Sequence, residues 1–402
     1  MDSSIRGRQA ASPTKCANRD ALPETVASRC YGPAMKRFRA FIFAMAACAT
    51  ADAFADAPFL DGFFPIGVWV PPPYDYAKWQ GRGINTINEI AYDEAGSIAM
   101  ADSLGLHMMR APQANPADDA NETLLLSWAH PDEPDGIYSQ VPYATIQSEY
   151  ATWKGIAPNR PVFINFVGDL NQYDIVTNES GDAWYEKYVA GADWISADKY
   201  PVNNGQANNL AVLGQMADHL HTLAGGKPLF AFIESSHIDT TDSARGPTPD
   251  ELRAEIWELI IHGVRGYFFF PEQIAPTFLF DTTPTNVVTE MTKQNAVVTS
   301  LAPVLQGTID PAGMSATVSA PLEAAWRSTS SARYFFVLNL SNATHNARTV
   351  TLSGIGNAPS AVVLNESRNV SIAASAITDD FAPYAVHIYV IAMDEIFGNG
   401  FD

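Results

Sequence analysis

Cysteine is almost absent from this chain. Its 402 residues include three cysteines, and all of them precede residue 56 (Cys16, Cys30 and Cys48). The rest of the chain therefore has no disulfide bond, no thiolate nucleophile and no zinc–sulfur site. Histidine gives no sign of a metal site either, because His107, His130, His237 and His262 show no ligand spacing such as H-x-x-x-H. We expect neither a metal nor a cofactor.

Basic side chains are also scarce. Lys and Arg number 24 against 44 Asp and Glu, which gives a net charge of −20. Nucleic acid and anionic lipid require clustered basic residues, so this balance argues against both as partners. It fits a protein that acts on neutral substrates. Since 47% of the residues are hydrophobic and 17% are charged, the chain has enough apolar surface for a large core.

The N-terminal segment has the pattern of a targeting signal. Residues 35–39 are basic and begin with a methionine, residues 40–51 are apolar but too short to span a bilayer, and 53–55 read Ala-Phe-Ala. We predict a signal peptide over 35–55, cleaved after Ala55, and a secreted or periplasmic protein with no membrane attachment after cleavage. Residues 1–34 are interpreted as a mis-assigned extension. A short N-terminal membrane anchor is the alternative.

Removal of residues 1–55 would change the charge further. This segment holds eight basic and four acidic side chains, so its loss takes the net charge from −20 to −24. The mature protein would be more acidic than the full chain.

From residue 59 onward, short apolar runs alternate with longer amphipathic ones. Most of the short runs are apolar at nearly every position, as buried parallel strands are. We predict eight strands, at 63–69, 84–90, 106–110, 124–128, 161–167, 194–200, 229–234 and 266–270. Helices are predicted between them, for example at 143–156, 183–190, 210–223, 249–262 and 287–305.

Eight strand–helix units over about 245 residues predict a (β/α)8 TIM barrel, an α/β fold, over residues 56–308. An open doubly wound sheet is the alternative. Such a sheet often has a glycine-rich phosphate turn after its first strand. Here that strand is followed by Val70-Pro71-Pro72-Pro73, which cannot cradle a phosphate.

The composition changes near residue 310. From there to residue 393, short strands alternate with turn residues, most clearly at 333–340, 347–352, 361–364 and 385–391. We predict a small all-β sandwich over 309–393. The last nine residues, 394–402, form a separate tail that could serve in sorting.

Two glutamates occupy the positions where a barrel carries its chemistry. Catalytic groups of this fold lie at the C-terminal ends of the strands. Glu133 follows the fourth predicted strand, in the stretch Trp128-Ala129-His130-Pro131-Asp132-Glu133-Pro134-Asp135-Gly136, and Glu234 ends the seventh. Carboxylates on these strands can face each other across the barrel mouth, and such a pair can cleave a glycosidic bond.

Other polar and aromatic residues fall at the same strand ends. Aromatic faces can pack on the C–H faces of sugar rings, and the polar side chains can bind hydroxyl groups. The candidate substrate-binding residues are Trp69, Arg110, Trp128, His130, Asp132, Asn165 and Tyr200. For Trp194, early in its strand, a place in the core is the expectation. No G-x-S-x-G motif indicates a serine nucleophile.

This pattern resembles the clan of retaining (β/α)8-barrel glycoside hydrolases, as a divergent member with a C-terminal β-sandwich. The resemblance covers residues 56–393 and implies Glu133 as acid/base and Glu234 as nucleophile. Tyr200 matches a tyrosine that hydrogen-bonds the nucleophile in many members. The chain departs from the clan at Asp132, where members usually carry Asn. The implied protein is a secreted, monomeric glycosidase that cleaves β-linkages in a poly- or oligosaccharide with retention.

Alternatives remain open at this stage. Glu133 could cap the following helix, Glu234 could be structural, Glu89 could pair with Arg110, and Tyr200 could be rim packing. An inverting enzyme would need a wider carboxyl separation, about 6.5–9.5 Å against 5–5.5 Å for retention. A non-catalytic carbohydrate-binding or cell-surface protein on a degenerate barrel would leave one carboxylate pointing away from the pocket.

Overall fold

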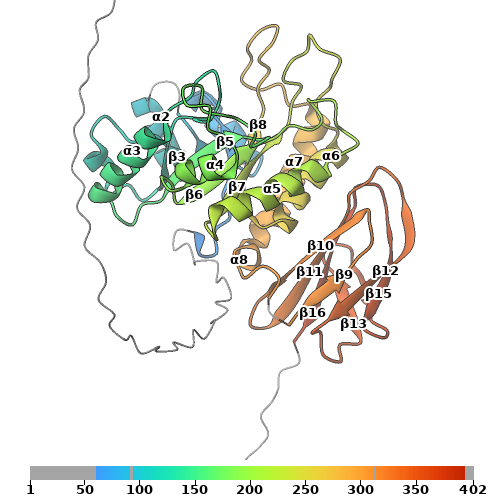
Figure 1. Cartoon of the computed structure of the whole chain (residues 1–402). Coiled ribbons are helices and arrows are strands. Elements are labelled where there is room, and N and C mark those ends of the chain that lie inside the picture. Colours follow the sequence, from blue (N-terminus) through green and yellow to red (C-terminus); the bar gives the residue numbers. More distant parts are fainter. Residues whose placement is uncertain (1–59, 91–93, 312, 394–402) are drawn as a thin grey trace, which may run out of the picture. The chain divides into compact units, whose positions relative to one another are not determined.

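The computed structural model of the chain describes residues 60–90, 94–311 and 313–393. The predicted signal peptide, the segment before it and the tail at 394–402 lie outside the described residues. The two parts that matter for function are a barrel and a pair of antiparallel sheets (Figure 1).

Eight parallel strands close into a barrel in sequence order, from β1 next to β2 round to β8 next to β1. This confirms the predicted fold class. The strands are β1 Ile66–Trp69, β2 Thr86–Asn88, β3 His107–Arg110, β4 Leu125–Ala129, β5 Val162–Val167, β6 Trp194–Asp198, β7 Leu229–Glu234 and β8 Val264–Phe270.

Alternation along each strand decides which side chains fill the barrel. In β6, Trp194 packs in the interior while Ile195 and Ala197 face the helices. Phe230, Phe232 and Phe268 fill the same interior cluster. The prediction that Trp194 belongs to the core is therefore confirmed. Large aromatic side chains occupy the space inside the barrel, so only its mouth is left for a ligand.

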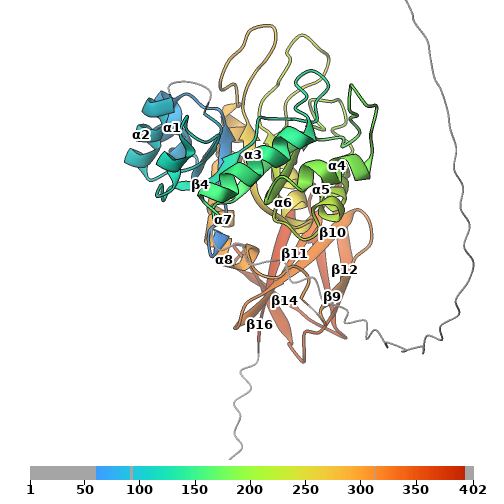
Figure 2. The same ribbon diagram turned by 60° about the vertical axis from the view of Figure 1, so that its left-hand side comes forward.

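Helices surround the strands (Figure 2). They are α1 Tyr76–Gly81, α2 Glu94–Leu104, α3 Tyr143–Ile156, α4 Asp182–Val189, α5 Ala211–Ala224, α6 Pro249–Ile261, α7 Thr285–Ser300 and α8 Ala302–Leu305. At the start of α6, Thr248 and Glu251 form a reciprocal capping box. The helix predicted over 287–305 is divided at Leu301, since Pro303 has no N–H to continue the hydrogen-bond ladder.

The C-terminal strands form a five-stranded sheet in the order β10-β11-β16-β13-β14 and a three-stranded sheet in the order β15-β12-β9. Apolar side chains from both sheets share one core, as in a sandwich. The bounds are β9 Ser315–Thr317, β10 Leu322–Ser328, β11 Ala332–Asn339, β12 His345–Ser353, β13 Ser360–Val363, β14 Arg368–Ser371, β15 Ala376–Phe381 and β16 Val386–Ala392.

Helix α6 joins the barrel to the first of these sheets. The Trp257 ring stacks on Phe336 with centroids 5.8 Å apart, and the buried Arg327 donates to the carbonyl of Ile260 at 2.8 Å. Trp257, Phe336 and Arg327 are each at most 1% exposed. The sandwich is therefore packed on the outer side of α6, and its Tyr384 also reaches Ala207 in the loop between β6 and α5.

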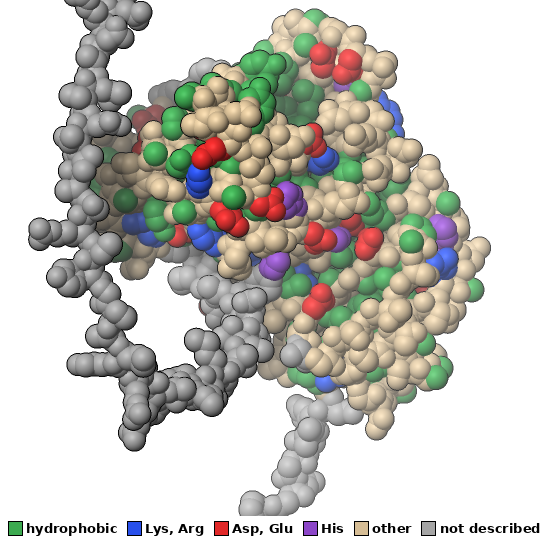
Figure 3. All heavy atoms as spheres, viewed as in Figure 1, with side chains coloured by type: hydrophobic (Ala, Val, Ile, Leu, Met, Phe, Trp, Pro, Cys, Tyr) green, Lys and Arg blue, Asp and Glu red, His purple; other side chains and the backbone are tan. Residues whose placement is uncertain are grey.

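None of the helices within the described residues is long and apolar enough to cross a membrane. On the face shown in Figure 3, basic side chains are scattered among acidic ones rather than gathered into one patch.

Candidate active site

The C-terminal ends of the barrel strands surround two adjoining cavities. The larger has a volume of about 480 Å³, and six of its lining residues matter here: Trp69, Asp132, Glu133, Asp198, Tyr200 and Glu272. The smaller, of about 390 Å³, is lined by residues that include Glu89, His130 and Trp153. Trp69 and Asp132 line both. The two cavities therefore meet at these residues and can hold parts of one extended ligand.

The loop after β4 is fixed by aspartates on both sides of Glu133. Asp132 accepts a hydrogen bond from Asn165 at 3.0 Å. Asp135 is completely buried and accepts from the Val167 amide at 3.1 Å and the Tyr185 hydroxyl at 3.0 Å. The loop is thereby held to β5 and α4, and Glu133 between the two anchors faces the larger cavity.

Glu133 has a backbone conformation that is unusual for its residue type. Its φ is 44°, in the left-handed region, and its carbonyl accepts a hydrogen bond from Gly136 at 2.8 Å in the turn that follows. A non-glycine residue in this region destabilises the folded state by about 1–3 kcal/mol, and such residues concentrate at functional sites. The anchored aspartates supply the contacts that hold this conformation.

Asp198 and Glu133 form a carboxyl pair in the cavity. Asp198 ends β6, and its side chain hydrogen-bonds to those of Glu133 and Tyr200. Burial, the charges of Glu133 and Asp132, and the hydrogen bond to Glu133 raise the pKa of Asp198 well above its usual range, although the bond from Tyr200 opposes this. Two adjacent carboxyls cannot both be ionised cheaply, so this arrangement favours the protonated form of Asp198.

Gly168 allows the close approach that places Asp198. A Cβ atom at Gly168 would clash with the backbone carbonyl of Asp198. Glycine lets the loop after β5 run against the end of β6 at this point. Tyr200 completes this part of the wall, where its ring lies 5.2 Å from that of Phe270.

Three further carboxyls around the cavities have raised pKa values. Burial raises the pKa of Glu272 to about 7. For Glu89, burial and the charge of Asp132 raise the pKa to about 8. Asp132 stands at the exposed rim, where desolvation and the charge of Glu133 still raise its pKa to about 6 against the opposing hydrogen bond from Asn165. Perturbed carboxyls of this kind are typical of reactive sites.

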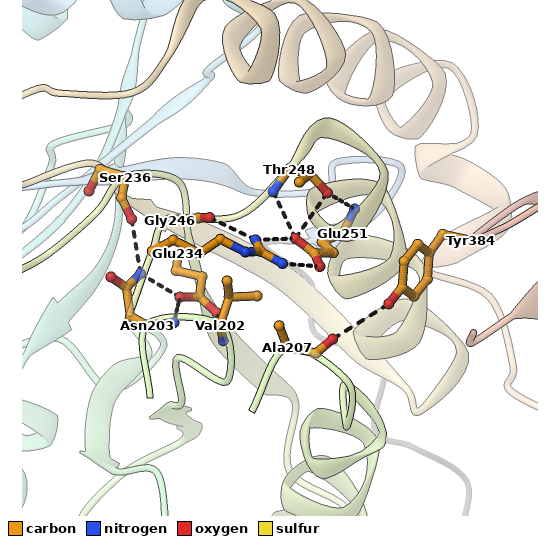
Figure 4. A network of polar contacts seen from close by, with 10 residues as sticks. Val202, Asn203, Ala207, Glu234, Ser236, Gly246, Thr248, Glu251 and Tyr384 are labelled. Carbon is orange, nitrogen blue, oxygen red and sulfur yellow. Dashed lines mark hydrogen bonds and ion pairs between the residues drawn. The ribbon is translucent and has the colours of Figure 1, made fainter. Parts of the chain in front are cut away.

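Glu234 lies behind the cavity wall. It is completely buried and does not line either cavity. Its oxygens accept hydrogen bonds from the amides of Val202 at 2.6 Å and Asn203 at 2.8 Å, and from the Asn203 side chain (Figure 4). In this arrangement the carboxylate anchors the loop between β6 and α5, the same loop that begins with Tyr200.

A second buried carboxyl accompanies Glu234. Glu255 of α6 is unexposed, and burial together with the charge of Glu234 raises its pKa well above the usual range. Burial also raises the pKa of Glu234, although the bonds from Asn203 and Val202 oppose it. Neither oxygen of Glu255 has a hydrogen-bond partner among the described residues, so each buried carboxyl disfavours ionisation of the other. Nearby, Arg245 pairs with Glu251 at 2.7 Å.

Arg110 and Trp128 belong to a buried network that lies outside both cavities. Arg110 forms a two-bonded ion pair with Asp119, at 2.6 and 3.2 Å, and not with Glu89. The Trp128 indole donates to the same carboxylate at 2.9 Å. Arg110, Trp128 and Asp119 are at most 1% exposed. The structure therefore does not bring these two predicted substrate contacts to the site.

His130 lines the smaller cavity but has partners of its own. Its ring stacks on Trp153 with centroids 4.8 Å apart, and its nitrogens lie 2.9 Å from the Gly191 carbonyl and 3.3 Å from Glu149. Burial lowers the pKa of His130, and the contacts with Gly191 and Glu149 oppose the change. Asn165 donates to Asp132 through its side-chain nitrogen, and its buried Oδ1 has no hydrogen-bond partner among the described residues.

The structure thus brings together Trp69, Asp132, Glu133 and Tyr200 around one cavity. Sequence reasoning missed Asp198 and Glu272 as site residues. Asp198 could have been found from the alternation of side chains along β6. It lies two residues after Ser196 and four after Trp194, both of which point into the barrel, so its side chain should point the same way. Within the described residues, no group of three or more His, Cys, Asp or Glu side chains could hold a metal ion.

Comparisons with known proteins identify the fold of the chain but not a family. No family model matches the chain, and no curated sequence matches it. Solved structures do: an α-amylase from Geobacillus thermoleovorans (TM-score 0.55, 10% identity, 80% of this chain and 91% of that one) and the GH42 β-galactosidase Gan42B (0.56, 8%, 82% and 98%). An Anoxybacillus α-amylase is also similar (0.51, 10%, 83% and 98%). At these identities the likeness shows the shared barrel architecture alone.

The buried network around Asp119 predicts a large effect on stability. Replacing Asp119 with Ala leaves Arg110 buried without its partner, which should cost about 3–5 kcal/mol of unfolding free energy. The exposed neighbour Asp118, changed to Ala, is the matched control and should cost less than about 1 kcal/mol. Urea denaturation of both variants measures the difference.

The same network predicts a pH dependence. Burial alone would raise the pKa of Asp119, but hydrogen bonds from Arg110, Gln113 and Trp128 outweigh it and hold the pKa below the usual range. The stabilisation is therefore present above the unfolded-state pKa and is lost as the pH falls through the folded-state value. Equal costs for the two variants at neutral pH would contradict this account.

Proposed function

We propose that this protein is a glycoside hydrolase that uses the larger cavity as its active site and the Glu133–Asp198 pair as its proton donor. The observation that carries the proposal is the pair itself. Two carboxyls from different strand ends lie side by side on the wall of one cavity, and the burial of Asp198 beside Glu133 favours its protonated form. Glycosidic cleavage requires a carboxylic acid that keeps its proton at neutral pH.

The pair can act on a glycosidic bond as follows. Its proton passes to the glycosidic oxygen while the bond from that oxygen to the anomeric carbon breaks. A water molecule supplies the hydroxyl that replaces the leaving group, and its remaining proton returns to a carboxylate. The protein's part is to keep the donor protonated in the empty site, which the burial of Asp198 and its contact with Glu133 support.

Aromatic and polar groups support a carbohydrate as the substrate. Trp69 is half-buried, packs edge-on against Phe232 with centroids 5.5 Å apart, and forms a wall common to both cavities. An exposed indole face on a fixed ring suits the apolar face of a sugar. Structures with the same barrel architecture include α-amylases and a β-galactosidase, which is consistent with this substrate class.

A finer version of the proposal is the one predicted from the sequence: a secreted enzyme that cleaves β-linkages with retention, with Glu234 as nucleophile. Here Glu234 is bound to the amides of Val202 and Asn203. The retaining mechanism therefore requires the loop between β6 and α5 to release this carboxylate when the substrate binds. Burial of Glu234 beside Glu255 is compatible with either a nucleophile or a structural anchor.

One observation favours a second function. A non-catalytic carbohydrate-binding protein on a degenerate barrel would leave one of the two predicted carboxylates directed away from the pocket, and Glu234 does not line the cavity. The Glu133–Asp198 pair is the feature that this alternative does not explain.

Substitution of the pair tests the proposed hydrolysis. Glu133→Gln and Asp198→Asn should each lower kcat/KM by about 10²–10⁴-fold, the usual contribution of a general acid. Activity is measured as reducing-sugar release on a panel of neutral and amino-sugar glycans. Glu94→Gln and Asp61→Asn, two exposed carboxylates outside both cavities, are the matched controls.

Two outcomes contradict the proposal. Unchanged hydrolysis by both pair variants would remove the proton donor from Glu133 and Asp198. Binding of a glycan by the wild-type protein without any cleavage would support the non-catalytic alternative.

Product stereochemistry tests the retaining version. Proton NMR during the first turnovers should show a product with the same anomeric configuration as the substrate, and Glu234→Gln should be inactive while it remains folded. Thermal melting of this variant distinguishes a lost nucleophile from a lost anchor. An inverted product together with an active Glu234→Gln protein would assign the attack to water and leave Glu234 as the loop anchor.

A further inference from the structure

The larger cavity carries acidic charge without any basic side chain in its wall. Six carboxylates line it: Asp132, Glu133, Asp198, Asp239, Asp242 and Glu272. Its other lining residues are neutral, and the smaller cavity adds Glu89 and Glu149 with His130 but no Lys or Arg. A uronic acid, sulfated or phosphorylated sugar would meet like charge throughout this space.

The cations nearest in the fold already have partners elsewhere. Arg110 is paired with Asp119, Arg245 with Glu251, and Lys199 with Asp169. His237 lies 3.3 Å from Asp242 and its charge acts on Asp239, at one end of the cavity. No Lys or Arg ion pair within the described residues reaches the other four carboxylates, Asp132, Glu133, Asp198 and Glu272. This deficit is consistent with the raised pKa values of Asp132, Asp198 and Glu272.

Glu272 is the cavity carboxyl that most clearly has neither a hydrogen-bond donor nor a counter-charge in the described part of the chain. Its residue is 5% exposed and lines the larger cavity. Burial is the one influence on its carboxyl, since no hydrogen bond or charge of a described residue offsets it. A buried carboxylate without donors is costly, so this group is best satisfied by a donor from the ligand. The Oδ1 atom of Asp198, in the wall of the same cavity, is buried and has no hydrogen-bond partner among the described residues.

The arrangement does not suit a metal ion as the missing charge. A metal ion needs several ligands at one point, and no such group exists within the described residues. The carboxylates are instead spread along a space formed by two cavities that meet at Trp69 and Asp132. An extended ligand with charges at intervals fits this distribution.

We propose that the glycan cleaved here contains unacetylated 2-amino-2-deoxy sugars, whose ammonium groups bind the carboxylates of the cavity, with Glu272 as a main contact. This inference rests on the proposed function as a glycoside hydrolase and names its substrate class. An ammonium group supplies three donors and a positive charge, so it satisfies Glu272 as a hydroxyl cannot. The apolar face of the sugar ring would lie on Trp69.

Binding to the inactive full-length Glu133→Gln protein tests this inference. Isothermal titration at pH 7 compares a β-linked glucosamine tetramer, the N-acetylglucosamine tetramer and cellotetraose. The glucosamine tetramer should bind about tenfold more tightly than either of the others, as expected for a hydrogen bond that gains charge. Its advantage should shrink as the salt concentration rises, because screening weakens exposed charge pairs.

A second variant assigns the contact. When Glu272→Gln is introduced into the Glu133→Gln protein, most of the preference for the glucosamine tetramer should disappear. Glu186→Gln is the matched control, since Glu186 is an exposed carboxylate of α4 that lines neither cavity. Thermal melting of each protein shows whether it is folded. The salt dependence of binding is measured only on the single variant Glu133→Gln.

The outcomes separate this inference from the proposed function. Equal or tighter binding of a neutral tetramer, or no binding of any tetramer, overturns the amino-sugar assignment. Cleavage of a neutral glycan by the wild-type protein would then still support a hydrolase. Selective binding of the glucosamine tetramer without cleavage by the wild-type protein supports the assignment and rejects the hydrolase.

Discussion

The anchoring of the loop after β4 is the constraint on which the candidate site depends. Asp132 is held by Asn165, and Asp135 is held by the Val167 amide and the Tyr185 hydroxyl. Between them Glu133 keeps a left-handed backbone conformation and meets Asp198 at the cavity wall. Loss of either anchor would free the loop, and Glu133 would lose its fixed position beside Asp198.

The barrel also contains two pairs of buried carboxyls. One pair, Glu133 and Asp198, lies at the cavity, and another, Glu234 and Glu255, lies behind it. In each pair, two adjacent negative charges in a poorly solvated site are unfavourable, which favours the protonated forms of Asp198 and Glu255. The pair behind the wall fixes the loop that carries Tyr200 and Asn203, so it determines the shape of the cavity without lining it. The absence of basic residues from the cavity wall then makes a cationic ligand the natural counter-charge.

The barrel could be predicted from sequence because its strands are uniformly apolar and its helices are periodic. All eight strands were located, and β7 and α3 match to the residue. The start of β8 was placed two residues late, since Arg265 interrupts the apolar run and its side chain instead donates to the carbonyls of Leu305 and Gly307. The site was harder, because strand-end position does not give side-chain direction. Trp128 sits at a strand end like Trp69, yet it faces Asp119 and the helices. Glu272 gave no sequence signal, since its burial depends on loops that follow β7 and β8.

The most direct test of the account is the crystal structure of the Glu133→Gln protein with a bound amino-sugar tetramer. The account predicts a chain of sugars through both cavities, with one ring on Trp69, an amino group within hydrogen-bonding distance of Glu272, and a glycosidic oxygen beside position 133 and Asp198. A tetramer bound elsewhere on the protein, or one whose glycosidic oxygens all lie away from Asp198 and position 133, would contradict it.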